Sequence, residues 1–420
     1  MINAKQRERF YGWTVVAAAF IIAIFGWGVG FYGPPIYLKA AQDARQWSVT
    51  FVSSAVTLHF LIGAVVVANL PRLHRRFGLP GVTIAGALSL ALGVLGWSLA
   101  SEKWMLIIAA ILTGVGWVPL GAAAINAMVS PWFVAKRPAA LAMAYNGASV
   151  GGVLFSPLWA LLIGSIGFSS AAIIVGVAML IIVGALSLRI LTRTPTSMGL
   201  APDGGDAASA AARKSMSDHA PEKLFADYAF VTLAAGMAIG LFAQIGLIAH
   251  LFSLLTPALG AQFAGVAAGL ATASAILGRT IVGWLMPADA DRRLIAGANL
   301  GVQMLGCAAF LLAGGGNIPL LFAGVILFGF GIGNSTSLPP LIAQAEFAPK
   351  ITPRVVALTT ACSQATYAFA PAAFGLLRDL SAGDATLVFI AAALIQALGA
   401  TAYLAGRRRA APISAAATLD

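Results

Sequence analysis

Charged side chains are scarce in this sequence. Only 9% of its 420 residues are Asp, Glu, Lys or Arg, whereas about a quarter are charged in a typical soluble protein. Hydrophobic residues make up 60%. A water-soluble core would be built from elements with a polar face, but long stretches here have no polar face. A soluble globular protein is therefore excluded, and we interpret the apolar stretches as membrane spans.

Acidic residues are the scarcer of the two charged classes, with 14 Asp and Glu against 25 Lys and Arg. All 14 acids lie in loops, tails or span ends, so no proton relay of carboxylates inside the membrane is indicated. The basic residues lie in short segments between the apolar stretches, as expected for charges excluded from hydrocarbon. This distribution excludes nucleic-acid binding despite the net charge of +11.

Cysteine and histidine are also rare. Cys307 and Cys362 both fall within apolar stretches, which indicates buried thiols rather than a disulfide framework or a metal site. The histidines are scattered, and no cluster of nucleophile, base or metal ligands is apparent. A glycine-rich nucleotide-binding loop is missing too. We therefore predict no enzyme activity, catalytic residue, metal or cofactor. The four histidines are His59, His74, His219 and His250.

Twelve stretches are long enough to cross a bilayer, which requires about 20 apolar residues. The first is too long for the core of a signal peptide and is expected to remain as a helix. We predict an all-α membrane protein. The spans are predicted over residues 11–38, 47–71, 79–101, 104–129, 138–165, 168–192, 228–257, 261–287, 294–314, 317–345, 353–377 and 384–406.

A polar segment rich in Ala and Ser, from Arg193 to Asp227, separates the spans into two groups of six. Its composition is typical of a flexible linker. The predicted organisation is a six-helix bundle over 1–194, a linker over 195–226, a second bundle over 227–407 and a tail over 408–420. With the N-terminus inside, 20 of the 25 Lys and Arg lie on the inner side and 4 on the outer side. Both termini and the linker are therefore predicted to be cytoplasmic, in a plasma or bacterial inner membrane.

Two six-helix bundles joined by a polar linker resemble the plan of major facilitator transporters. The sequence from Trp132 to Pro157, WFVAKRPAALAMAYNGASVGGVLFSP, is similar to the monocarboxylate transporter and oxalate/formate antiporter branch. So are Tyr11-Gly12-Trp13, PTSMGLAPDGGD from Pro195 to Asp206, and GRTIVGWLMPAD from Gly278 to Asp289. The resemblance implies a carrier of small carboxylates that works by alternating access, with an arginine of the eighth helix, here Arg279, holding the carboxylate.

The residues themselves also point to Arg279. It lies about eight residues from the cytoplasmic end of its predicted span, roughly 12 Å deep at 1.5 Å per residue. A guanidinium there costs about 2.5 to 3.5 kcal/mol unless it faces water or a partner. Its planar donors match a carboxylate, and no Asp or Glu lies at a comparable depth. We predict that it binds a substrate anion; the alternative is a snorkelling arginine that helps to close the cytoplasmic gate.

Further binding residues are predicted on the helices that line the cavity in this superfamily. His59 and His250 are candidates for proton coupling as well as binding, because histidine titrates near physiological pH, although each could instead be a neutral residue of a helix interface. The other candidates are polar or aromatic, and each could equally pack between helices. They are Tyr32, Tyr145, Asn334, Gln364 and Tyr367.

A single deep arginine favours one carboxylate over two, since the eleventh predicted span has no lysine. We therefore expect a secondary transporter of monocarboxylates such as lactate or pyruvate, with proton symport, acting as a monomer in the lipid bilayer. One alternative is an exporter of drugs or other amphiphilic molecules, which would be expected to have an acidic residue in the cavity. The other is a carboxylate exchanger. A membrane enzyme or receptor is a third class, without support from the residue pattern.

Overall fold

The computed structural model describes residues 10–407 apart from 48, 205–217, 288 and 381–384. Within these ranges every regular element is helical, which confirms the predicted fold class. The predicted tail over 408–420 and the middle of the predicted linker lie outside the described residues.

The chain before the linker forms seven helices, with short 3-10 turns at Val118–Leu120 and Ser130–Trp132 that continue α4 and α5. Two of the helices are the halves of one broken span, α1 and α2, interrupted at Phe31 and Tyr32. The seven helices are α1 (Tyr11–Gly30), α2 (Gly33–Arg45), α3 (Val49–Leu99), α4 (Lys103–Trp117), α5 (Ala122–Val129), α6 (Arg137–Ile166) and α7 (Phe168–Arg189).

The chain after the linker also forms seven helices. They are α9 (Tyr228–Leu285), α10 (Arg292–Ala313), α11 (Ile318–Ile332), α12 (Asn334–Glu346), α13 (Thr352–Tyr367), α14 (Ala370–Leu380) and α15 (Ala385–Ala405). The linker itself contributes three 3-10 turns, Thr196–Met198, Pro202–Gly204 and Leu224–Ala226.

Ten helical segments in the described residues are long and apolar enough to cross a membrane. One of them, Ser54–Leu99, contains a chain reversal at Gly78, whose φ of 74° is one that glycine adopts easily. Dividing it there, and taking α13 with α14 as one broken span, gives the predicted twelve. The long helix α9 reverses in the same way at Gly260, with φ 71°.

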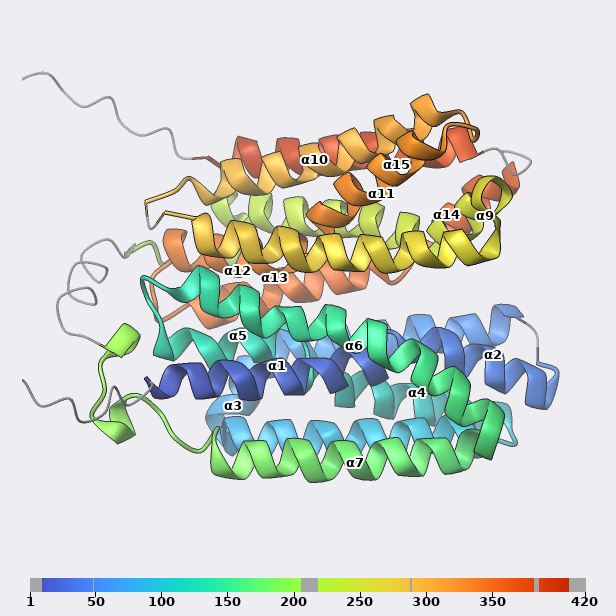
Figure 1. Ribbon diagram of the computed structural model, residues 1–420. Coiled ribbons are helices and arrows are strands. Elements are labelled where there is room, and N and C mark those ends of the chain that lie inside the picture. Colours follow the sequence, from blue (N-terminus) through green and yellow to red (C-terminus); the bar gives the residue numbers. More distant parts are fainter. Residues whose placement is uncertain (1–9, 48, 205–217, 288, 381–384, 408–420) are drawn as a thin grey trace, which may run out of the picture.

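The helices form two groups that lie side by side in Figure 1. Helices α1 to α7 pack among themselves, as do α9 to α15, and the groups meet where α3 contacts α13 and α6 contacts α9. The start of α1, the end of α15 and the linker lie at the same end of the molecule, which we call the linker end (Figure 1). The groups come together at this end and diverge toward the opposite end.

Glycines allow close contacts between helices in both groups. A Cβ at Gly147 would collide with the carbonyl oxygen of Phe20, so α1 and α6 touch through their backbones. Gly329 and Gly333 face backbone atoms of α9 in the same way. These contacts hold the cavity-lining helices at fixed distances.

A charge pair closes the linker end of the second group. The Arg293 guanidinium donates from Nε to Glu346 Oε1 at 2.6 Å and from Nη2 to Oε2 at 2.8 Å. It also donates to Thr232 Oγ1 at 3.0 Å and to the Ala229 carbonyl at 2.6 Å. Arg293 is only 2% exposed. One side chain thus joins α9, α10 and α12.

We predict that Glu346→Gln destabilises the protein by about 3 kcal/mol, because it leaves a buried guanidinium without its counter-charge. The measurement is the thermal unfolding midpoint in detergent, followed by tryptophan fluorescence. Asp291→Asn is the matched control: it breaks the exposed pair with Arg407 but still caps α10 through its side-chain oxygen, and should cost less than about 1 kcal/mol. Equal midpoints for the two variants would contradict the prediction.

Candidate functional site

A cavity lies between the two groups of helices, and its empty space, together with the open solvent at its mouth, is about 910 Å³. Both groups contribute to its wall. The residues are Trp27, Phe31, Tyr32, Val67, Trp117, Val118, Gly121, Ala122, Ala123, Ala148 and Ser149 from the first group, and Met237, Leu241, Gln244, Ile245, Ile248, Arg279, Ile332, Thr336, Thr360, Ser363, Gln364 and Tyr367 from the second.

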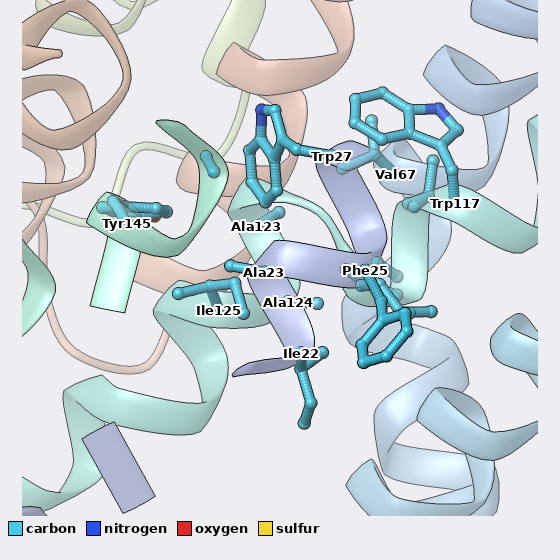
Figure 2. Close-up of a cluster of buried hydrophobic side chains, with 14 of the residues drawn as sticks. Ile22, Ala23, Phe25, Trp27, Val67, Trp117, Ala123, Ala124, Ile125 and Tyr145 are labelled. Carbon is cyan, nitrogen blue, oxygen red and sulfur yellow. The ribbon is translucent and has the colours of Figure 1, made fainter. Parts of the chain in front are cut away.

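Aromatic rings form one side of this cavity. Trp27 and Trp117 meet edge to face with ring centroids 6.1 Å apart, and Phe31 lies 6.2 Å from Trp117. Figure 2 shows the rings of Trp27 and Trp117 on the opposite side of α1 from Ile22, which points into the core of the first group. This side of the cavity suits the apolar part of a small organic molecule.

Arg279 is the one charged side chain in the wall, counted over the residues that the structure describes. It is 3% exposed. Its Nε donates to the Gly333 carbonyl at 2.7 Å, and Nη1 donates to the Tyr145 carbonyl at 2.6 Å and to Asn146 Oδ1 at 3.1 Å. Helix α9 ends at Leu285, two residues before the predicted limit, so Arg279 lies about 9 Å from that end.

The Arg279 guanidinium meets only uncharged oxygens among its described partners. Two acids of the second group are paired elsewhere: Glu346 with Arg293 and Asp291 with Arg407. Nη2 of Arg279 has no hydrogen-bond partner within the described part of the chain, and protein atoms do not enclose it completely. Positive charge and a free donor are therefore presented to the cavity.

Residues of α13 and α1 complete the cavity. Gln364 donates from Nε2 to the Phe60 carbonyl of α3 at 2.8 Å, which joins the two groups. The Tyr367 ring lies 5.8 Å from that of Phe60 and 6.4 Å from that of Phe31. Tyr32 follows the break between α1 and α2, and its ring faces Gly152 of α6. Three of the predicted binding residues are thus brought to one wall with Arg279.

Two predicted residues have their side chains elsewhere. Tyr145 is fully buried, and its hydroxyl donates to the Ala122 carbonyl of α5 at 2.8 Å. It touches the site only through the backbone carbonyl that accepts from Arg279. Asn334 lines a separate small cavity between α9, α10 and α12, on another face of its helix from Ile332 and Thr336, which line the central one.

The two histidines also lie outside the cavity wall. His59 is buried between α3 and α4, with Nδ1 2.9 Å from Thr113 Oγ1 and its ring stacked on Trp117 at 6.1 Å. Its Nε2 is enclosed without a hydrogen-bond partner among the described residues. His250 lies near α14, with Nε2 3.0 Å from the Pro371 carbonyl and Nδ1 3.2 Å from Arg378 Nη1.

Polar residues that the sequence reasoning did not single out also line the cavity. They are Gln244 on α9, Ser149 on α6 and Thr336 on α12. The signal for Gln244 was present, since an amide in the middle of an apolar span needs a partner. The orientation of each helix about its own axis decides which polar groups share one cavity. Residue spacing along a helix does not predict this orientation.

The linker end of the cavity is closed by contacts between the groups. Gln344 of α12 donates from Nε2 to Asn126 Oδ1 at 2.8 Å and to Ser130 Oγ at 2.9 Å. Asn146 donates to Thr280 Oγ1 at 2.9 Å, and Gly283 lies directly against Ala142. In this state the central cavity is therefore shut off from the linker end.

The linker is anchored to the same region. Both oxygens of the Asp203 carboxylate accept from backbone N–H groups, those of Val134, Ala135 and Lys136, at 2.9, 2.7 and 3.1 Å. These residues precede α6, and an acid at the start of a helix is favourable. Two sequence motifs far apart in the chain, the start of the linker and the Trp132 segment, are thus in contact.

We predict that Gly283→Leu opens the linker end, because its side chain would displace Ala142 and the Pro138 carbonyl of α6. A Ser149→Cys reporter in the cavity should then react several-fold faster with an impermeant thiol reagent added on the linker side of oriented vesicles. Gly301→Leu on α10 is the control, since nothing lies within 4 Å of its Cβ position. The prediction fails if both leucine variants give the same labelling rate.

Comparison with known proteins adds an independent observation. The model of the Major Facilitator Superfamily matches residues 15–371. The MFS transporter asaE of Aspergillus flavus is 24% identical over 401 residues, which cover 93% of this chain and 85% of that protein. Monocarboxylate transporter 12 of Mus musculus is 27% identical over 203 residues, 46% of this chain and 40% of that protein. MFS-type transporter 1 of an Ophiocordyceps species is 25% identical over 191 residues, covering 44% and 42% respectively.

Proposed function

The chain belongs to the Major Facilitator Superfamily, and from that premise we propose that it is a secondary transporter of small monocarboxylates that works by alternating access with proton symport. Membership makes it a membrane transporter rather than an enzyme. The resemblance predicted from the sequence is confirmed at the level of the superfamily. Substrate, proton coupling, the plasma or inner membrane and the cytoplasmic position of both ends belong to the proposal.

The observation that carries the proposed substrate class is the unpaired charge of Arg279 in the cavity wall. Burying a guanidinium without a counter-charge is costly, and its three described partners are neutral oxygens. A carboxylate that enters the cavity supplies the missing charge and can accept from the free Nη2. Drugs that are amphiphilic cations would be repelled at this point.

One carboxylate is favoured over two because Arg279 is the one cation in the described wall. A second carboxylate would lie against Trp27, Phe31 or Trp117, which offer apolar surface and no balancing charge. The apolar body of a monocarboxylate instead fits this side.

Alternating access is supported by the contacts between the groups. The same guanidinium that faces the cavity also donates to the backbone of α6 at Tyr145. It therefore belongs both to the binding site and to the contacts that close the linker end. This unites the two roles that the sequence left open for Arg279, carboxylate binding and gate closure.

For proton coupling we favour His59 over His250. Nε2 of His59 is buried without a hydrogen-bond partner among the described groups, and Trp117, against which the His59 ring stacks, lines the cavity. The His250 nitrogens face the Pro371 carbonyl and the Arg378 guanidinium, an arrangement that fits a neutral ring with its proton on Nε2. A second proton, on Nδ1 of His250, would lie against the positively charged guanidinium of Arg378.

We predict that Arg279→Lys abolishes uptake of radiolabelled lactate and pyruvate into proteoliposomes. Lysine keeps the charge but has no planar fork that can hold Gly333 and α6 and still offer a donor to the substrate. Arg354→Lys, at an exposed position near the start of α13, is the control and should transport normally. Full uptake by Arg279→Lys, with unchanged folding by size-exclusion chromatography, would remove Arg279 from the site.

We further predict that His59→Gln flattens the pH dependence of uptake while His250→Gln preserves it. Glutamine can still donate to Thr113 but takes up no proton near neutral pH. The measurement is initial uptake between about pH 5.5 and 8, with and without an imposed pH gradient. Unchanged profiles in both variants would exclude histidine from the coupling.

A further inference from the structure

On the premise that the cavity carries carboxylates, we propose that Gln244 is a second recognition residue, whose amide N–H binds an uncharged oxygen acceptor on the substrate that Arg279 holds. The substrate class is then a monocarboxylate that also carries a keto or hydroxyl oxygen. Gln244 lines the cavity from α9 and is 3% exposed.

A buried network fixes which end of the Gln244 amide faces the cavity. Gln396 Nε2 donates to Gln303 Oε1 at 3.0 Å, so Gln303 must present its NH₂ group to the other side. There Gln303 Nε2 donates to Gln244 Oε1 at 3.3 Å, and Ser335 Oγ donates to the same oxygen at 2.7 Å. With its oxygen held by two donors, Gln244 can turn only its NH₂ group to the cavity.

The NH₂ group of Gln244 remains available to a ligand. Within the described ranges no residue accepts a hydrogen bond from Nε2 of Gln244. Protein atoms leave this nitrogen accessible, whereas they fully enclose Trp117 Nε1, which also has no partner there. The network that holds it is fully buried, with Gln303 and Gln396 at 0% exposure. An amide fixed in this way loses little conformational freedom when it binds, so it can discriminate between ligands.

Gln244 and Arg279 lie at similar depth in the membrane. Both belong to α9, which reverses at Gly260. Gln244 comes 16 residues before this reversal and Arg279 comes 19 after it, a difference in depth of about 5 Å at 1.5 Å per residue. Both donors therefore lie at a comparable level in the wall of one cavity.

The same helix break anchors the two donors. Arg279 Nε donates to the carbonyl of Gly333, at the break between α11 and α12, and Ser335, two residues later, holds Gln244. Gln303 packs against Gly331, just before the break. A shift of this break would therefore move both donors together, so the spacing between them is maintained.

The test is uptake of matched acids with and without the second oxygen: pyruvate against propionate, and 4-oxopentanoate against pentanoate. In at least one pair the wild type should prefer the oxo acid. Gln244→Leu should raise the KM for that oxo acid roughly fivefold, the loss expected for one hydrogen bond, and change the KM of its partner by less than about twofold. Equal effects on both acids, or none, overturn the proposal.

Ser335→Ala tests the orienting network without altering Gln244, and guards against a Gln244→Leu variant that fails to fold. It should weaken the preference for the oxo acid in the same direction and leave the plain acid unchanged. Ser337→Ala on the same helix is the control, because Ser337 bonds only to the Asn334 carbonyl among the described contacts and lies outside the cavity wall. If Ser335→Ala lowers uptake of both acids equally, the network is merely structural and the proposal is wrong.

The two levels of the hypothesis fail differently. If the wild type carries none of the four acids, carboxylate transport is excluded and Gln244 recognition with it. If the acids are carried and depend on Arg279, but Gln244→Leu does not distinguish the members of either pair, the proposed function stands and Gln244 recognition alone is excluded.

Discussion

The central constraint in this protein is a guanidinium held inside a membrane without an acid to neutralise it. Arg279 is 3% exposed and donates to three neutral oxygens. These bonds lower the cost of burial but leave the charge uncompensated. The proposed anionic substrate class and the proposed preference for one carboxylate both rest on this imbalance.

The position of Arg279 connects binding to the conformational cycle. Its bond to the Tyr145 carbonyl crosses from the second group of helices to the first, beside the contact of Asn146 with Thr280. The proposed substrate carboxylate would accept from Nη2 of the same guanidinium whose Nη1 holds the Tyr145 carbonyl. Binding can therefore change the balance between the two conformations only through its differential effect on these contacts, as required for any ligand-driven transition.

One short stretch of helix carries much of the polar chemistry of the cavity. Gly333 lies between α11 and α12, and its carbonyl accepts from Arg279, while Ser335 holds Gln244. The backbone at Gly333 is itself helical, with φ −60° and ψ −37°, so Ile332 and Thr336 continue one face across it and both line the cavity. Asn334 lies on another face of the same stretch and lines the smaller cavity. The rotation of this helix thus decides which of its residues reach the site.

The sequence by itself determined the all-helical membrane fold and the single deep arginine, because exclusion of charge from hydrocarbon acts on each residue separately and is visible in composition and spacing. Its motifs also indicated the superfamily. Only the tertiary structure decided which side chains meet. It brings Tyr32, Gln364 and Tyr367 to the cavity with Arg279, leaves His59, His250, Tyr145 and Asn334 out of its wall, and adds Gln244. Helix rotation and contacts between residues more than 100 positions apart set these placements, and no local pattern encodes them.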